Sequence, residues 1–420
     1  MCISHRRGVM AAVGSLLLLS SPAWADELPS PLHLRDLVAL LRRNNPEVAE
    51  RRSLARAAAA RPRAVSQLDD PMLSVEWWQQ PINFSMVPLM VSVRQPLPWP
   101  GKLRARREVA EREVATSRDQ IVEAERRLEA QAKIAFFDLA LAEQSLAIND
   151  RQRTLVEAMV QSAESRYRVG KAPQASILKT QEELLTVDNE RLDLERARDE
   201  GRARLNALLD RPAAAPLPPV ALPPSAVRLP DETELVRTAL ERRPDVKLAE
   251  DAVAQAQARL GVARREANPE LAVWAGYMVN IRGVDTFTAG VSTTLPIFSA
   301  RRRTGAVTGG EAELEASRHA LDAARRRAEL EVRTAILQMD AALRHEKLHS
   351  AKLIPLSELS LQSAQAAYQN DRIDFFSVLD AARMLRTHHL DHERYLIEYQ
   401  KRLAELELAV GQDFGAEETR

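Results

Sequence analysis

The chain has 420 residues, of which 28% are charged and only 4% are aromatic. Its 59 Lys and Arg residues balance 59 Asp and Glu residues, so no net charge attracts it to nucleic acid, and we expect no nucleic-acid partner. Abundant Ala, Leu, Glu and Arg with few aromatics favours long helices over a large compact core.

The first 25 residues have the pattern of an export signal. The positive segment HRR, the apolar segment AAVGSLLLL and the cleavage site Ala23-Trp24-Ala25 follow in the required order, which predicts a signal peptide at 1–25. The apolar segment is too short for a membrane anchor, which needs ~20 residues. The only cysteine is Cys2, so the exported protein should hold no disulfide. No later segment is apolar enough for a transmembrane helix, and a membrane-inserted part would have to consist of β-strands.

The pattern of prolines and turn residues in the first half of the chain returns about 200 residues later. The matched pairs are Pro46 and Pro244, Pro71 and Pro269, Pro96 and Pro296, and Tyr167 and Tyr368. Their offset grows only from 198 to 201 residues, which indicates an internal duplication whose two halves pack together. We therefore expect a first repeat at 32–210, a Pro-rich linker at 211–230, a second repeat at 231–412 and a tail at 413–420.

Both repeats predict the same order of elements: a short helix, a medium helix, two strands, a long helix and a return helix. The short helices are expected at 34–43 and 231–241, the medium helices at 47–67 and 246–266, and the return helices at 174–209 and 374–410. Together the long and return helices should occupy about 102–209 and about 303–410.

Two short segments in each repeat alternate apolar and polar residues, which predicts β-strands. They are Met72–Gln79 with Leu89–Gln95, and Leu271–Val279 with Phe287–Leu295. The strands hold the aromatic residues Trp77, Trp78, Trp274 and Tyr277. Two interpretations stay open: soluble hairpins packed on helices, or membrane strands with aromatics at the bilayer interface. Four strands cannot close a barrel, whereas three chains would supply twelve.

The longest predicted helix begins after the turn PLPWPGK. From Lys102 to Val169 the chain has neither Pro nor Gly, and at ~1.5 Å per residue this run would extend about 100 Å. The second repeat mirrors the run from Glu311 to about Tyr368, with Pro355 expected to kink or break the helix. Apolar residues spaced seven apart predict a coiled coil or helical tube. In the first run they are Val114, Ile121, Leu128, Ala135 and Ala142.

In their order and spacing these motifs resemble the TolC family of outer-membrane efflux proteins over nearly the whole mature chain. The motifs are the duplication, ALERRPDVKLAEDAVAQAQARLGVARREANPEL, the joints RQPLPWPGKL and TTLPIFSARR, the turns after Tyr167 and Tyr368, and LNALLDRPAAAPL. The resemblance implies a mostly α chain with a small β part. Three chains would form a homotrimer, with a twelve-helix periplasmic tunnel of long hairpins and a twelve-stranded β-barrel in outer-membrane lipid.

The resemblance also implies a passive duct rather than an enzyme, with no cofactor and no resident metal. Its partners would be a periplasmic adaptor (a membrane fusion protein) and an RND-type inner-membrane pump. Adaptor docking is implied at the turns between long and return helices. These tips are Val169-Gly170-Lys171 in the first repeat and Asn370-Asp371-Arg372 in the second, where Asp371 replaces the usual glycine.

A ring of carboxylates at the periplasmic aperture is a further implication of the resemblance. Asp380 matches one acidic position, Ser377 stands where the other is expected, and Asp371 and Asp374 are additional candidates. Three copies of a carboxylate around a constriction attract cations and repel one another. The alternative for Asp380 is a solvated acidic residue on a helix face.

RQPLPWPGKL and DDPML are most similar to the heavy-metal efflux branch of the family, which comprises copper/silver and cobalt/zinc/cadmium systems. Met72, Met86 and Met90 would then offer soft ligands to Cu(I), or else pack within strands and loops. A duct of the same fold for drugs or other organic solutes is the alternative.

One motif points to a different class of protein. HEKLH at His345–His349 fits H-E-x-x-H, in which two histidines on one helix face bind zinc and Glu346 acts as general base. Its flanks are charged, and proline stands at position 355, where one protease class has a third ligand. We therefore interpret this motif, and HHLDH with His388, His389 and His392, as solvated helix faces rather than a zinc metallopeptidase site. An adventitious metal contact at HHLDH is the alternative.

A periplasmic coiled-coil adaptor or scaffold is the third class considered. Such adaptors carry a single helical hairpin flanked by β-rich domains. This sequence instead predicts two duplicated hairpins, each in register with paired strands, which favours the duct.

Overall fold

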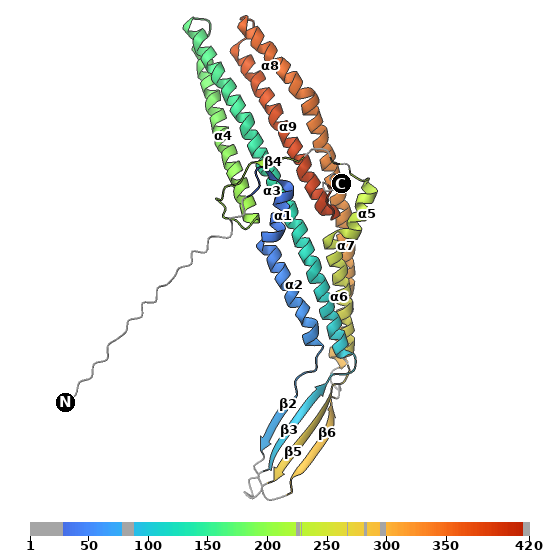
Figure 1. Cartoon of the computed structure of the whole chain (residues 1–420). Coiled ribbons are helices and arrows are strands. Elements are labelled where there is room, and N and C mark those ends of the chain that lie inside the picture. The colour runs from blue at the N-terminus through green and yellow to red at the C-terminus, as the bar shows by residue number, and fades with distance from the viewer. Residues whose placement is uncertain are drawn as a thin grey trace, which may run out of the picture.

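The computed structural model describes residues 28–414 except 78–87, 224–226, 228, 267, 281–283 and 295–299. The expected signal peptide, Trp78, Met86 and the joint at Pro296 lie outside these residues. The described chain is elongated. A small β-sheet lies at one end, the turns of two long helical hairpins lie at the other, and helices run between them (Figure 1).

The two repeats fold into the same succession of elements, which confirms the internal duplication. The first comprises α1 (Leu34–Asn44), α2 (Pro46–Val65), β2 (Met72–Trp77), β3 (Pro88–Leu97), α3 (Lys102–Arg168) and α4 (Gln174–Leu208). The second comprises α5 (Glu232–Arg242), α6 (Pro244–Glu266), β5 (Leu271–Asn280), β6 (Thr286–Thr293), α7 (Ala300–Leu348), η1 (His349–Leu353), α8 (Ile354–Gln369) and α9 (Phe375–Val410).

The segment between the repeats is not a free spacer. Its strand β4 (Val220–Ala221) pairs in parallel with β1 (Leu32–His33), and the Leu32 amide donates to the Pro219 carbonyl at 3.0 Å. Leu217 is buried in the core of the first repeat. The Pro-rich segment therefore folds back onto the beginning of that repeat.

Capping residues set the helix boundaries. The Asn45 side chain accepts the amide of Glu47 at 2.9 Å, and Pro46 occupies the first turn of α2, where a missing N–H costs nothing. At the other end of the chain, Gly411 adopts φ of 76° and donates its amide to the Glu407 carbonyl at 2.8 Å, which ends α9.

The second long helix begins close to the expected position. α7 begins at Ala300, near the expected 303 and before the glycine-free run that starts at Glu311. The three glycines between these positions do not break the helix. Gly310 contacts α6, where an added Cβ would lie only 3.2 Å from Cδ1 of Leu260, so its small size permits a close approach of the two helices.

Pro355 interrupts the second long helix, as its sequence predicted. The helix widens into the π-helix η1 immediately before Pro355, since proline lacks an N–H and its ring clashes with the preceding turn. The equivalent stretch of α3 has no proline and stays α-helical.

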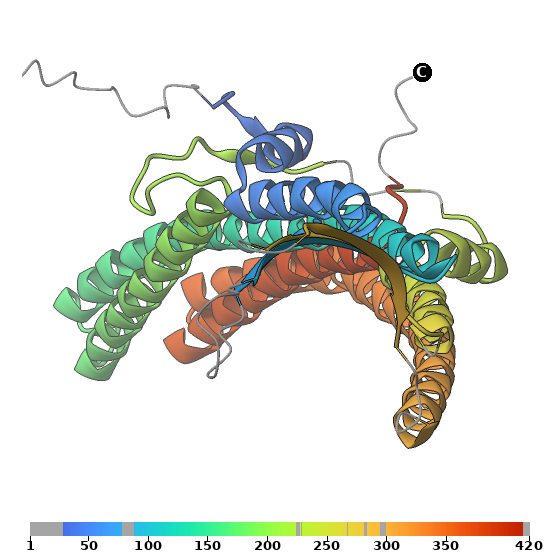
Figure 2. The ribbon, with the colours of Figure 1, turned by 90° about the horizontal axis from the view of Figure 1, so that it is seen from below.

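Seen along its long axis, the molecule is a curved layer of helices (Figure 2). α3 lies at the centre of this layer. It packs against α4 and α9 on the side of the hairpin turns, and against α2 and α6 on the side of the sheet. α7 and α8 form one edge of the layer, α2 and α4 form the other, and α1 and α5 lie on its convex side.

The two main hydrophobic cores are related by the duplication. One joins α1, α3 and α4, and the other joins α5, α7 and α9. Residues that the duplication aligns are buried at corresponding places in the two cores. The pairs are Leu37 and Leu235, Leu41 and Ala239, Leu205 and Leu406, and Leu209 and Val410. Each fully buried Leu contributes about 1.5–3 kcal/mol to the folded state, so these small cores hold the short helices and the ends of the return helices on the long ones.

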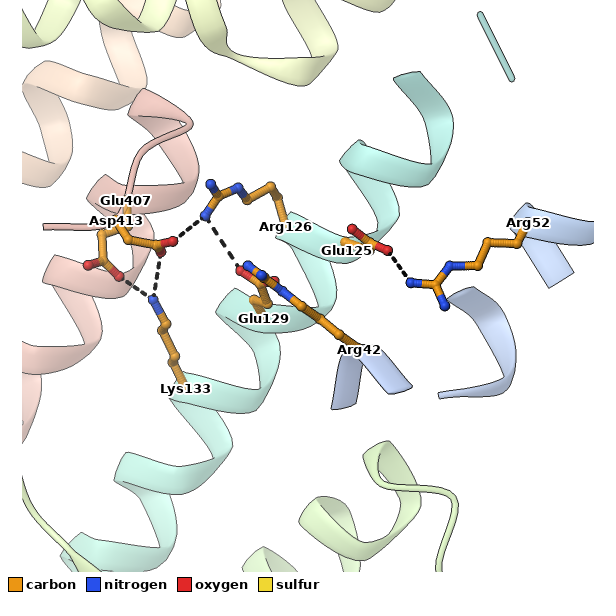
Figure 3. A network of polar contacts seen from close by, with 8 residues as sticks. All are labelled: Arg42, Arg52, Glu125, Arg126, Glu129, Lys133, Glu407 and Asp413. Atoms are coloured by element: carbon orange, nitrogen blue, oxygen red, sulfur yellow. Dashed lines mark hydrogen bonds and ion pairs between the residues drawn. The ribbon is translucent and has the colours of Figure 1, made fainter. Parts of the chain in front are cut away.

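A network of charged side chains fastens the two repeats together (Figure 3). Lys133 of α3 is 11% exposed and places Nζ 2.5 Å from Glu407 and 3.1 Å from Asp413, at the end of the second repeat. Arg126 reaches Asp413 at 2.6 Å and also approaches Glu129. The buried Glu129 pairs in turn with an arginine of α1, so the network spans α1, α3 and α9.

The four strands form one antiparallel sheet in the order β2-β3-β5-β6. Its register places apolar side chains opposite one another across every strand pair, so that one face of the sheet is apolar. This face comprises Leu73, Val75, Trp77, Leu89, Val91, Val93, Val273, Ala275, Tyr277, Val279, Phe287, Ala289 and Val291. The other face is mixed: it carries Ser74, Glu76, Ser92, Arg94, Thr286, Thr288 and Ser292, together with Met72, Met90, Trp274 and Met278. None of the described helices is long and apolar enough to cross a membrane.

Candidate functional site at the hairpin tips

The first hairpin tip is an exposed turn between α3 and α4. Gly170 adopts a left-handed conformation with φ of 71°, and its amide donates to the Tyr167 carbonyl at 2.9 Å. The Lys171 amide donates to the Arg166 carbonyl at 2.8 Å and closes the turn. An added Cβ at Gly170 would meet no atom within 4 Å, so backbone conformation alone favours glycine here. Val169 and its two neighbours all face solvent, as a docking surface requires.

The second tip, between α8 and α9, has the same backbone despite its different sequence. Asp371 has φ of 56°, and its amide donates to the Tyr368 carbonyl at 3.1 Å, while the Arg372 amide donates to the Ala367 carbonyl at 2.9 Å. Aspartate tolerates the left-handed region better than most residues, so the turn survives the replacement of glycine. Asn370, Asp371 and Arg372 are all exposed.

Arg166 connects the two tips, and sequence reasoning missed it. Its guanidinium pairs with Asp371, donates to the Tyr368 carbonyl at 3.3 Å, and lies 4.4 Å from the centroid of the Tyr368 ring. The two hairpins are therefore joined at their tips by a charge pair and a cation–π contact. No local pattern could reveal this, because Arg166 and Tyr368 are 202 residues apart in the chain.

Two of the aperture candidates, Asp374 and Ser377, are hydrogen-bonded to each other at the beginning of α9. Asp374 caps the helix: its Oδ1 accepts the Ser377 amide at 2.9 Å and the Ser377 hydroxyl at 2.6 Å. These hydrogen bonds from Ser377 hold the pKa of Asp374 below its usual value. Asp374 is thus anionic and fixed in position, and Ser377 orients it.

Asp380 is exposed one turn further along α9. Among the described residues it has no hydrogen-bond or ion-pair partner, and it lies within the electrostatic reach of Arg383. Arg383 itself is bound to Glu183 of α4, which is only 2% exposed, at an Nε–Oε2 distance of 2.8 Å. A second pair, Arg386 with Glu190, repeats the contact one turn away. These pairs hold α9 and α4 together just behind the tips, and the sequence carries no local signal for them.

The histidines of the two sequence motifs do not form an H-E-x-x-H zinc site. His345 is exposed and stacks on Tyr395 with ring centroids 4.6 Å apart. His349 is buried and faces His388 and Asp391 of α9 instead. The interpretation of solvated helix faces is therefore wrong for His349, and His388, His389 and His392 are half-buried rather than solvated.

The described methionines of the strand segments differ in their surroundings. Met72 is 59% exposed. Met90 lies over Gly276 of β5, where its methyl group would be 2.8 Å from an added Cβ. Gly276 gives Met90 room to pack across the strands, which fits the packing interpretation.

An elongated chain with two long helical hairpins at one end and a sheet with one apolar face at the other has the architecture of a membrane-anchored duct. A family model described as outer membrane efflux protein matches residues 39–211 and 235–412, so the chain belongs to that family. The two matched segments fall in the two repeats. Members of the family are passive channels, and the chain is therefore an outer-membrane efflux channel with a periplasmic extension, not an enzyme.

Solved outer-membrane channels share this fold at low sequence identity. OprN has a TM-score of 0.80 and 19% identity, with 91% of this chain and 90% of that chain covered. CusC has a TM-score of 0.79 and 18% identity, with 90% and 92% covered. MtrE of Neisseria gonorrhoeae in its open state has a TM-score of 0.76 and 19% identity, with 91% and 89% covered. No curated protein sequence matches the chain significantly.

Proposed function

We propose that three copies of this chain form one duct, which receives heavy-metal cations from a periplasmic adaptor and an RND-type inner-membrane pump and releases them outside. The sheet carries this proposal. Its apolar face is exposed in the single chain: Trp77 is 77% exposed, Phe287 70% and Val291 71%. β3 and β5 each have ten residues, and ~9–11 residues let a tilted strand cross a bilayer.

The edges of the sheet support the homotrimer. β2 and β6 each have only one neighbour among the described strands, so each leaves a row of backbone donors and acceptors unpaired. Inside a bilayer such groups must be satisfied by another strand. If β6 of one copy pairs with β2 of the next, three copies close a sheet of twelve strands in outer-membrane lipid.

The helical layer supports the same assembly. On α4, at one edge of the layer, Leu178, Leu185 and Leu192 are spaced seven apart and are 59%, 70% and 64% exposed. On α8, at the other edge, Leu356 and Leu359 are 66% and 64% exposed. Exposed apolar rows on two different edges suit a head-to-tail ring, in which each edge covers the other in the next copy.

The tips are the proposed contact with the adaptor. Val169 is 68% exposed, and its turn projects beyond the helices together with the turn of Asp371 (Figure 1). The pair between Arg166 and Asp371 presents both turns as one surface.

The aperture is the proposed point of cation passage. Asp374 and Asp380 lie about 1.7 helical turns apart at the beginning of α9, where three copies would contribute six carboxylates to one ring. Together with RQPLPWPGKL and DDPML, whose similarity is to the heavy-metal branch, this favours cations over organic solutes.

A gene deletion tests the substrate, and fractionation tests the duct. The deletion strain should become sensitive to one or more of copper, silver, zinc, cobalt, nickel and cadmium, and the intact gene should restore growth. Sensitivity to hydrophobic drugs and dyes alone would keep the duct and overturn the metal assignment. Absence of the protein from the outer-membrane fraction, or a monomer mass in detergent, would overturn the duct itself.

A further inference from the structure

A group of potential metal ligands joins the interrupted long helix of the second repeat to its return helix. His349 opens η1, and His388 and Asp391 lie one turn apart on α9. One ligand atom from each of the three lies within 4.8 Å of the other two. This group lies in the wall of the helical layer, away from the tip residues described above.

Two nitrogens of this group lack partners. His349 is only 7% exposed, and its Nδ1 is buried without a hydrogen bond. The Nδ1 of His388 is also buried without a hydrogen bond. Buried polar atoms in native proteins almost always have a partner, so two unsatisfied imidazole nitrogens on residues grouped with a carboxylate point to a missing ligand.

Ring packing does not replace that ligand. The rings of His349 and His388 meet at 63° with centroids 5.3 Å apart, and His349 lies 5.4 Å from the ring of Tyr395. These contacts fix the orientation of the imidazoles, but they satisfy no ring nitrogen.

Pro355 explains why the helix widens, but it does not explain the residues that face the widened turn. The duplication aligns His388 and Asp391 with Val187 and Glu190, 201 residues earlier. Before the interruption the offset is 200, as for Ala135 and Ala335, so His349 aligns with Asn149, whose side-chain amide donates to the Val187 carbonyl at 3.2 Å. Neither histidine thus has a histidine counterpart in the first repeat, and the two meet at the π-helix, a form of helix often associated with functional sites.

We propose that His349, His388 and Asp391 bind a divalent transition-metal cation of the Zn²⁺ type. Two imidazole nitrogens and one carboxylate oxygen are a common ligand set for Zn²⁺, with water in the fourth position. In a tetrahedral site with Zn–N bonds of ~2.0–2.1 Å the ligand atoms lie about 3.3 Å apart. The ligand atoms lie within 4.8 Å of one another here, so binding would draw the three side chains closer together.

One existing contact competes with the cation. Oδ1 of Asp391 accepts a hydrogen bond from Arg394 at 2.7 Å, and the Arg394 side chain is 62% exposed. An exposed ion pair within one helix contributes little to stability, so Arg394 yields the carboxylate readily. Binding of the cation would tie η1 directly to α9 and stiffen the second hairpin at its only interruption among the described residues.

The test uses the full-length protein in detergent, purified with a tag that contains no histidine and stripped with a chelator. Titration with ZnCl₂ in a calorimeter gives affinity and stoichiometry, and CoCl₂ gives the visible absorption of a tetrahedral site. His388→Ala and Asp391→Asn alter half-buried residues of α9 that leave the core intact. His345→Ala is the matched control, because it removes the other histidine of HEKLH, which lies outside the group.

One Zn²⁺ per chain is expected in the wild type and in His345→Ala, with affinity at least about tenfold weaker in His388→Ala and Asp391→Asn. Unchanged binding in His388→Ala, an equal loss in His345→Ala, or no binding by the wild type would each overturn the site. His349→Gln should also lose binding. If that variant misfolds, the two α9 variants decide the outcome alone.

Discussion

Lys133 gives the sharpest test of how the two repeats are fastened. Lys133→Met removes the one cation that contacts Glu407 among the described residues, and Glu407 is 8% exposed. Loss of one partner from a buried ion pair costs ~3–5 kcal/mol. The lower end applies here, because Asp413 is 32% exposed and keeps Arg126 at 2.6 Å, and Glu407 still accepts the Phe414 amide at 2.9 Å. We therefore expect a loss of about 3 kcal/mol in the free energy of unfolding.

A second variant tests whether the loss comes from an unpaired buried charge rather than from the changed volume of the side chain. Replacing both partners, as Lys133→Met with Glu407→Leu, leaves no buried charge unpaired at that contact and should recover most of the loss. The measurement is denaturant unfolding of the detergent-solubilised protein, followed by far-UV circular dichroism for the four members of the double-mutant cycle. A Lys133→Met loss below about 1 kcal/mol, or a double variant as unstable as the sum of the singles, would refute the reasoning.

The contribution of the same network to folding stability depends on pH in a direction that the pKa shifts of Lys133 and Asp413 define. Burial alone would lower the pKa of Lys133, but Glu407 and Asp413 outweigh it and raise this pKa. The contribution of Lys133 is therefore full below the unfolded pKa of ~10.4 and is lost as pH rises through the higher folded pKa. Burial alone would raise the pKa of Asp413, but Lys133 and Arg126 outweigh it and lower this pKa. The contribution of Asp413 is present above ~3.9 and is lost as pH falls through the folded pKa.

Four further outcomes follow from the structure. Asp413→Asn should lower the unfolding midpoint at pH ~7, and its gap from wild type should narrow as pH falls below ~3.9, because the wild type then loses the contribution of Asp413 on the way to its lowered folded pKa. Gly411→Ala should cost at least about 1 kcal/mol in the same assay, because φ is 76° and the new Cβ would lie 3.1 Å from a backbone oxygen of α5. Leu185→Glu should convert the trimer to monomer by light scattering, whereas Thr186→Glu, on another exposed face of α4, should not. Asp380→Asn should reduce cation over anion selectivity of the channel in planar bilayers, and unchanged selectivity would remove Asp380 from the aperture.

Most of the fold was predictable because the positions of the prolines and glycines agree with the hydrophobic periodicity of the segments between them. Prolines and glycines mark the joints, the strand segments alternate with period two, and the long runs without either residue are helical. The glycine-free run of α7 was expected only from Glu311, because glycines usually mark a helix end, while Gly310 lies within a helix packed against α6. Packing, which a single sequence does not display, decides that case.

The tip sequences were predictable, but the contacts that hold them were not. Val169 to Lys171 stand out as a break between two helical runs. Arg166, by contrast, is one arginine among many in a charged helix, and its partner Asp371 belongs to the other repeat. Lys133 and Asp413 are likewise 280 residues apart in the chain. Such pairs are set by how the hairpins lie side by side, and no local pattern encodes that.

The two repeats share a backbone but have diverged in chemistry, and the divergence lies almost entirely on the second hairpin. The first tip keeps Gly170, which the turn needs for its conformation alone. The second tip places Asp371 in the same conformation and gains a partner in Arg166, so a strained residue is retained where it joins the hairpins. The second long helix is interrupted where the first is continuous, and the two histidines of the proposed metal site face that interruption. The duplication thus supplies a second copy of the hairpin that differs from the first at its tip and along its length, while the first stays continuously α-helical.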